Sequence, residues 1–120
     1  MATVLLIDDS PVQLRAREAV LHIAGFDTHI ATTVDSALAL LRSGSLATRI
    51  DAVITDHIMP QANGAEFVRE LRRINSTVPV IVISGMPEAE NDYQGLNVIF
   101  RSKPCPPEEL IAVVQAAVSA

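Results

Sequence analysis

The sequence predicts an α/β protein, a three-layer, doubly wound sandwich with a parallel sheet between two layers of helices. Short apolar runs alternate five times with longer segments of helical spacing, which is typical of a sheet covered by helices on both faces. The run Val80-Ile81-Val82-Ile83 is apolar at every position, and this suits a strand that is buried on both faces.

The five apolar runs are the expected strands. They lie at residues 4–7, 28–31, 52–55, 80–83 and 98–100, and the second run is the weakest. Successive parallel strands should be joined by right-handed crossovers.

The first helix is expected directly after the first strand. Ser10 can cap it, Pro11 suits its first position, and Gln13 completes a capping box. Gly25 is a plausible end of the helix. Apolar residues recur at helical spacing along it and are expected to face inward, namely Val12, Ala16, Ala19, Val20 and Ile23.

Three more helices have clear signals. They are expected to begin near Thr33, after Gly64 and near Pro107. Their inward residues are Val34, Leu38 and Leu41 in the second, Phe67, Leu71 and Ile74 in the third, and Leu110, Val114 and Ala117 in the last. Residues 86–95 are short, polar and acidic, so the fourth of the five expected helices should be short or irregular.

Composition limits the functions that are open to this chain. Its 120 residues suit one domain, residues 1–120, with an aliphatic core, because aromatic residues make up only 3%. A net charge of -5 argues against direct nucleic-acid binding. The single cysteine, Cys105, excludes an internal disulfide. No apolar stretch is long enough for a membrane span, so we expect a cytoplasmic protein.

Chemically reactive side chains follow four of the expected strands. The first ends at Asp8 and Asp9, the third at Asp56, the fourth at Ser84 and the fifth at Lys103. Ligands of open α/β sheets bind beyond these carboxyl ends. Clustered carboxylates raise one another's pKa unless a cation is present, and Mg²⁺ prefers a few carboxylates, waters and a phosphate oxygen. The sequence therefore predicts a Mg²⁺ site where a phosphoryl group could be moved onto a carboxylate.

The whole chain resembles the receiver domain of bacterial two-component response regulators. The resemblance lies in four motifs and their spacing: Asp8-Asp9, Asp56-His57-Ile58-Met59-Pro60 with Gly64, Ser84-Gly85, and Lys103-Pro104. It implies the flavodoxin-like strand order 2-1-3-4-5. It also implies a signalling switch, which assists its own phosphorylation but turns over no external substrate.

The resemblance implies a role for each of these residues. Asp56 would be the phosphoacceptor. Mg²⁺ would be bound directly by Asp9, Asp56 and the backbone carbonyl of Ile58, and through a water by Asp8. The phosphoryl group would be held by Lys103, Ser84 and the backbone N–H groups of His57 and Gly85.

The resemblance also implies partners and a switch. Phe100 would turn inward as Ser84 moves toward the phosphoryl group, and the Lys103–Pro104 bond would be cis. The donor would be a sensor or hybrid histidine kinase or a phosphotransfer protein, and the signal would pass to a downstream protein that the sequence does not name. No direct contact with nucleic acid or membrane is expected.

Two features depart from the usual receiver pattern. The interval from Ser84 to Lys103 is a few residues short, which indicates a reduced fourth helix. Ile58 and Met86 stand where family members often carry residues that influence attack of water on the aspartyl phosphate. Both are apolar, so we expect a long-lived phosphoryl group.

Other interpretations are open for these residues. Taken singly, Asp9 could be a helix cap and Asp56 a turn residue. A Mg²⁺-dependent phosphohydrolase with an aspartyl-phosphate intermediate is an alternative, but the familiar superfamily needs a second Asp two residues after its nucleophile, and Ile58 stands there. A receiver-like module that binds partners without phosphorylation is a third possibility.

Overall fold

The computed structural model describes residues 2–43, 49–58 and 63–119. Its strands are β1 (Thr3–Ile7), β2 (Asp27–Ala31), β3 (Ala52–Asp56), β4 (Val80–Ser84) and β5 (Ile99–Ser102). They form one parallel sheet in the order β2-β1-β3-β4-β5. The predicted fold class and strand order are therefore confirmed, and the predicted strand bounds differ from the observed ones by one or two residues.

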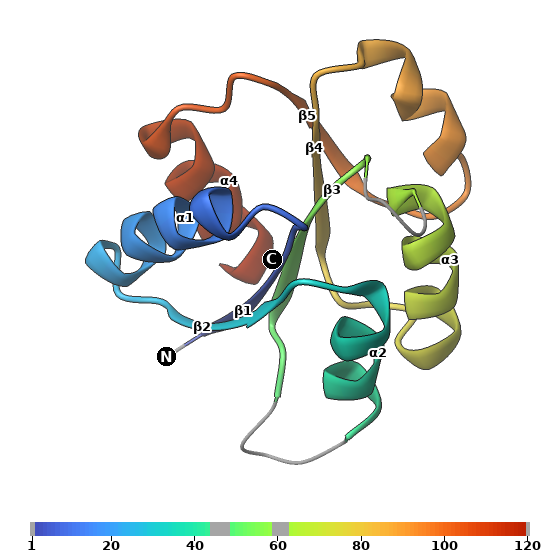
Figure 1. The fold of residues 1–120 in the computed structure, drawn as a ribbon, viewed down its shortest axis with the longest axis horizontal. Coiled ribbons are helices and arrows are strands. Elements are labelled where there is room, and N and C mark those ends of the chain that lie inside the picture. The colour runs from blue at the N-terminus through green and yellow to red at the C-terminus, as the bar shows by residue number, and fades with distance from the viewer. Residues whose placement is uncertain (1, 44–48, 59–62, 120) are drawn as a thin grey trace.

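Four α-helices and a 3₁₀ helix accompany the strands in the described part of the chain. They are α1 (Pro11–Ile23), α2 (Val34–Arg42), α3 (Gly64–Ile74), the 3₁₀ helix η2 (Pro87–Tyr93) and α4 (Pro107–Ser119). Figure 1 shows α1 and α4 on one side of the sheet and α2 and α3 on the other. The expectation of a short or irregular fourth helix is confirmed by η2.

Side-chain caps fix where the first three α-helices begin. Ser10, Thr33 and Asn63 each accept a hydrogen bond from a backbone N–H three residues later. Past the end of α1, Gly25 takes a left-handed conformation (φ +93°), as expected for the residue that terminates a helix. The Lys103–Pro104 bond is cis, as predicted.

The inward face predicted for the first helix is wrong. Val12 is 78% exposed and Ile23 is 87% exposed, whereas Leu14 and Leu21 are buried. Helix α1 carries apolar residues on two faces, and their periodicity alone does not say which face meets the sheet. The inward residues predicted for the other three helices are buried or half-buried.

Two apolar cores lie on opposite faces of the sheet. Successive residues of a strand point to opposite faces, so Leu5 and Ile7 pack with α2 and α3, while Val4 and Leu6 pack with α1 and α4. This is why the strands are apolar at nearly every position. No helix within the described ranges is both long and apolar enough to span a membrane.

The sheet brings the carboxyl ends of its strands to one rim. Ile7 of β1 pairs with Thr55 of β3, and Asp56 pairs with Ile83 of β4. The residues that follow these pairs therefore meet at the same edge, and the site lies there.

Candidate functional site at the carboxyl ends of the strands

Two buried carboxyl groups form the centre of the rim. Asp8 follows β1 and Asp56 ends β3, and they are 1% and 5% exposed. Asp9 is exposed beside them. The structure thus brings together the carboxylates that the sequence predicts, with one of them open to solvent.

The turn into α1 positions Asp8. The backbone N–H of Ser10 donates to Asp8 Oδ1 at 3.0 Å, and Ser10 Oγ accepts from the backbone N–H of Gln13 at 3.3 Å. Only half of the predicted capping box is therefore formed, because the N–H of Ser10 is engaged by Asp8. Gln13 Oε1 is consequently buried without a hydrogen-bond partner among the described residues.

Two cations contact Asp56. Lys103 Nζ lies 3.3 Å from Asp56 Oδ1, and Arg17 Nη2 lies 3.2 Å from the same oxygen. Arg17 Nη1 also lies 3.6 Å from Asp8 Oδ2, so its guanidinium bridges the two carboxyl groups. Lys103 was predicted here, whereas Arg17 was not.

A sequence signal for Arg17 existed. It lies three residues after Leu14 and four before Leu21, on the stripe of α1 that faces the sheet. A charged residue on a buried stripe indicates a buried partner of opposite charge.

The surroundings shift the two carboxyl pKa values in opposite directions. Burial, followed by hydrogen bonding with Asp56, raises the pKa of Asp8 to about 7. Burial also acts to raise the pKa of Asp56, but hydrogen bonding from Asp8 and the charges of Arg17 and Lys103 hold it below its usual value. Asp56 is therefore the member of the pair that ionises at the lower pH, and an ionised carboxylate is what a nucleophile requires.

The residues present fit a hard divalent cation. Asp8 Oδ2 accepts no hydrogen bond within the described structure, and it lies beside a second carboxylate. No group of three or more His, Cys, Asp or Glu side chains in residues 2–43, 49–58 and 63–119 is arranged to hold a metal. A Mg²⁺ site does not require such a group, because Mg²⁺ binds through one or two carboxylates and keeps several waters.

Ser84 lies at the rim, but its hydroxyl is hydrogen-bonded to the backbone of Met86 and not to Asp56. Its side chain is buried, and its Oγ accepts from the backbone N–H of Met86 at 3.0 Å. The backbone N–H of Lys103 donates to the carbonyl of Ser84 at 2.8 Å, which ties the ends of β4 and β5 together. The hydroxyl of Ser84 is thus held against the backbone of Met86.

The ring of His57 is buried and hydrogen-bonded, and its partner is not predictable from local sequence patterns. His57 Nδ1 and the Tyr93 hydroxyl lie 2.8 Å apart in a hydrogen bond, and His57 Nε2 lies 3.6 Å from Asp92 Oδ2. Burial and the nearby charge of Asp92 raise the pKa of Tyr93. The ring of Tyr93 also contacts Phe100, with centroids 6.0 Å apart. Tyr93 thus connects the residue after Asp56 to the predicted switch residue.

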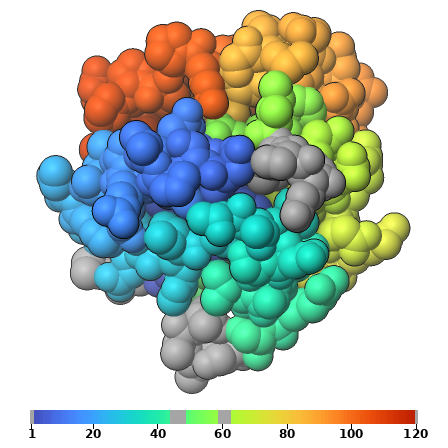
Figure 2. Space-filling view, viewed as in Figure 1, coloured from blue at the N-terminus to red at the C-terminus, as the bar shows by residue number. Residues whose placement is uncertain are grey.

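The rim is bordered by loops and by the first turns of α1. In the space-filling view the first turns of α1, in blue, lie against the orange residues that follow β5 (Figure 2). Ile58 and Met86 are exposed, at 64% and 39%. Met59 and Pro60 of the predicted motif lie outside the described residues.

Comparison with known proteins assigns this chain to a family. The family model of the response regulator receiver domain matches residues 4–115, so the chain belongs to that family. Receiver domains are signalling switches of two-component systems, and they generally bind Mg²⁺ at their acidic pocket.

Similar proteins include both curated sequences and solved structures. The transcriptional regulatory protein PrrA of Mycobacterium tuberculosis is 36% identical over 116 residues, covering 94% of this chain and 48% of that protein. A response regulator receiver protein of Sinorhizobium medicae is 30% identical with a TM-score of 0.86, covering 99% of this chain and 95% of that one. The chemotaxis protein CheY4 of Vibrio cholerae is 28% identical with a TM-score of 0.86, covering 98% of each chain. The chain spans about half the length of the curated relatives first matched.

Proposed function

We propose that this chain accepts a phosphoryl group on Asp56 from a phosphohistidine of a sensor kinase, a hybrid kinase or a phosphotransfer protein. The main support is the environment of the Asp56 carboxylate. It ends a buried strand, remains ionised, and lies 3.3 Å from Lys103 and 3.2 Å from Arg17. A carboxylate held among cations is suited to attack a phosphorus atom whose oxygens are negatively charged.

In the transfer, an Asp56 oxygen forms a bond to phosphorus while the bond from phosphorus to the histidine nitrogen breaks. The histidine leaves with its electron pair and takes up a proton. Lys103 contacts the phosphoryl oxygens as a point charge. The hydroxyl of Ser84 and the backbone N–H groups of His57 and Gly85 complete the set of donors around them.

Mg²⁺ would be held by Asp9, Asp56 and the backbone carbonyl of Ile58, with Asp8 acting through a water. Two observations support this assignment: Asp9 is exposed, and Asp8 Oδ2 accepts no hydrogen bond among the described residues. When bound, the ion neutralises charge that develops on the phosphoryl oxygens during transfer.

The conformational change is transmitted from Asp56 to the surface through Ser84 and Phe100. Ser84 lies on β4 beside β5, and Phe100 is half-buried on β5 against the core and the ring of Tyr93. A movement of Ser84 toward the phosphoryl group would free space for Phe100 to pack more deeply. We infer that a downstream protein reads this change in the cytoplasm, without direct contact of this chain with nucleic acid or membrane.

The test is phosphorylation by acetyl phosphate, followed by intact mass. The wild type should gain one phosphoryl group in Mg²⁺ and none in excess chelator, and Asp56→Asn should gain none in either buffer. Phosphorylation of Asp56→Asn to the same extent would contradict the proposal. Absence of phosphorylation in the wild type would instead favour a module that binds partners without phosphorylation.

A further inference from the structure

Arg17 occupies the space between the two buried carboxyl groups. Its guanidinium lies 3.2 Å from Asp56 Oδ1 and 3.6 Å from Asp8 Oδ2, and its side chain is 13% exposed. A cation bound between the same two side chains would need this position. Arg17 is thus a positive charge that the chain supplies to its own metal site.

The charge balance makes this contact relevant to metal binding. Asp8, Asp9 and Asp56 together can carry three negative charges, and Arg17 and Lys103 already supply two positive ones beside Asp8 and Asp56. A divalent cation that enters the rim is repelled by any guanidinium that stays beside it, because unit charges a few ångströms apart interact strongly where solvent is partly excluded. Binding is therefore favoured only when Arg17 withdraws.

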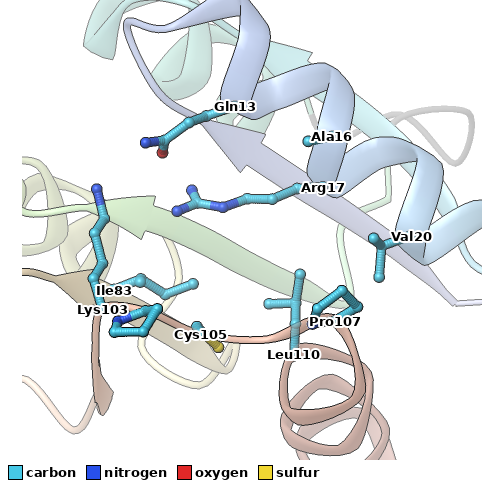
Figure 3. A pocket seen from close by; sticks show the side chains of 10 residues that line it. Gln13, Ala16, Arg17, Val20, Ile83, Lys103, Cys105, Pro107 and Leu110 are labelled. Atoms are coloured by element: carbon cyan, nitrogen blue, oxygen red, sulfur yellow. The ribbon is translucent and has the colours of Figure 1, made fainter.

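The structure contains a place for the withdrawn side chain. A cavity of about 530 Å³ between α1 and the start of α4 is lined by the polar residues Arg17, Gln13 and Lys103 and otherwise by mainly apolar residues. Gln13 lies one helical turn before Arg17, and its Oε1 is buried without a donor among the described residues. Figure 3 shows Gln13, Arg17 and Lys103 extending into the same region. The guanidinium can thus exchange a carboxylate oxygen for the amide oxygen of Gln13.

We propose that Arg17 is a tethered competitor of Mg²⁺, which occupies the acidic rim in the metal-free protein and moves toward Gln13 when the ion binds. This inference rests on the proposed function, because it assumes that the divalent cation binds at Asp56. It makes Arg17 a residue that sets the affinity for the metal.

The test is a calorimetric Mg²⁺ titration of the wild type, Arg17→Met, Arg17→Lys and Arg15→Met. Arg17→Met should lower the Kd for Mg²⁺ about tenfold, because it removes a charge beside the ion and keeps much of the side-chain volume. Arg17→Lys retains the charge and should stay near the wild type. Arg15 is exposed on the same helix, so its loss should change the Kd less than twofold.

A second measurement uses only the wild type and does not depend on how the variants fold. In a ¹H–¹⁵N spectrum, the Nε–H signal of Arg17 should shift during the Mg²⁺ titration at the same concentrations as the backbone signals of Asp56 and His57. A stationary Arg17 signal, or an Arg17→Met variant whose Kd equals that of the wild type, would overturn the inference.

Asp56→Asn separates this inference from the proposed function. If Asp56→Asn abolishes Mg²⁺ binding but Arg17→Met does not strengthen it, only the competition by Arg17 is wrong. If the wild type and Arg17→Met bind no Mg²⁺, or if Asp56→Asn binds it equally well, the metal site and the competition are both wrong.

Discussion

Asp8 and Asp56 lie side by side, yet only Asp56 has two cations beside one of its oxygens. Both are buried, but Asp56 has Arg17 and Lys103 within 3.3 Å of one oxygen, whereas Asp8 has Arg17 alone at 3.6 Å. The pKa of Asp8 is consequently raised to about 7 while that of Asp56 is lowered. As pH falls, Asp8 therefore takes up a proton before Asp56 does, which fits the proposed role of Asp56 as the phosphoacceptor.

The raised pKa of Asp8 predicts how stability depends on pH in metal-free buffer. A carboxyl group whose pKa is higher in the folded state stabilises the fold at low pH, and this stabilisation is lost as pH rises from about 4 through 7. The free energy of unfolding should fall over this range by up to roughly 4 kcal/mol from this group. Asp8→Asn should remove the decrease, measured by urea unfolding in excess chelator.

The control for Asp8 is an exposed carboxylate, and Asp27→Asn should leave the pH dependence intact. Saturating Mg²⁺ should abolish the decrease in the wild type, because the ion favours the charged form of Asp8. A wild-type protein whose stability rises between pH 4 and 7 without metal would contradict this assignment.

The apolar residues at the mouth of the site predict a long-lived phosphoryl group. Ile58 and Met86 are exposed at the rim, and neither side chain can hydrogen-bond a water that attacks phosphorus. Ile58→Asn and Met86→Glu should each shorten the phosphoryl lifetime by about tenfold, within the range typical of positioned acid–base groups. The measurement is the decay of the phosphorylated mass after removal of acetyl phosphate, and unchanged lifetimes would refute this explanation.

Helix η2 departs furthest from an ordinary α/β pattern, because it is a 3₁₀ helix where an α-helix is usual. Two side chains hold it in place by hydrogen bonds. Tyr93 at its end reaches His57, while Arg72 of α3 donates to the carbonyls of Leu96 and Asn97 that follow it. Gly64 completes the arrangement, because a Cβ there would collide with the Tyr93 hydroxyl and would lie 2.7 Å from the carbonyl oxygen of Asp56. A short helix is thus held against the site by polar contacts more than by an apolar stripe.

Tyr93→Phe tests the contact of η2 with the site. It keeps the ring that packs on Phe100 and removes only the hydroxyl that bonds His57. Because His57 Nδ1 is then buried without its partner, the free energy of unfolding should fall by about 1–3 kcal/mol. Gln94→Ala changes an exposed neighbour and should cost less than about 0.5 kcal/mol. Equal stability of Tyr93→Phe and the wild type would show that the hydroxyl does not hold η2.

Two neighbouring arginines on α3 test the hydrogen bonds that Arg72 makes to the segment after η2. Arg72 donates to the carbonyl oxygens of Leu96, Val78 and Asn97 at 2.7–2.9 Å. The side chain of the neighbouring Arg73 is 77% exposed, and its partner within the described part of the chain is Glu70. Arg72→Met should lower the free energy of unfolding by about 2–4 kcal/mol, and Arg73→Met by less than about 0.5 kcal/mol. Equal effects of the two changes in chemical denaturation would contradict this account.

For the molecule as a whole, the sequence predicted the layers and the place of the site better than the contacts within it. Continuous apolar strands such as residues 80–83 indicate a sheet covered on both faces, and strand-end residues of a parallel sheet must meet at one rim. The position of Arg17 does not follow from periodicity, because α1 has two apolar faces and the one that meets the sheet is not the one with more apolar residues. The contact between His57 and Tyr93 joins residues 36 positions apart, and no local pattern encodes such a pairing.

The most direct test of the account is to locate the phosphoryl group chemically. The protein would be phosphorylated with acetyl phosphate in Mg²⁺, reduced with borohydride, which converts an aspartyl phosphate to homoserine, and mapped by peptide mass spectrometry. The account predicts homoserine at position 56 in Mg²⁺ and none in excess chelator. Homoserine at position 8 or 9, or phosphate on a serine with position 56 unmodified, would contradict the central claim that Asp56 is the phosphoacceptor.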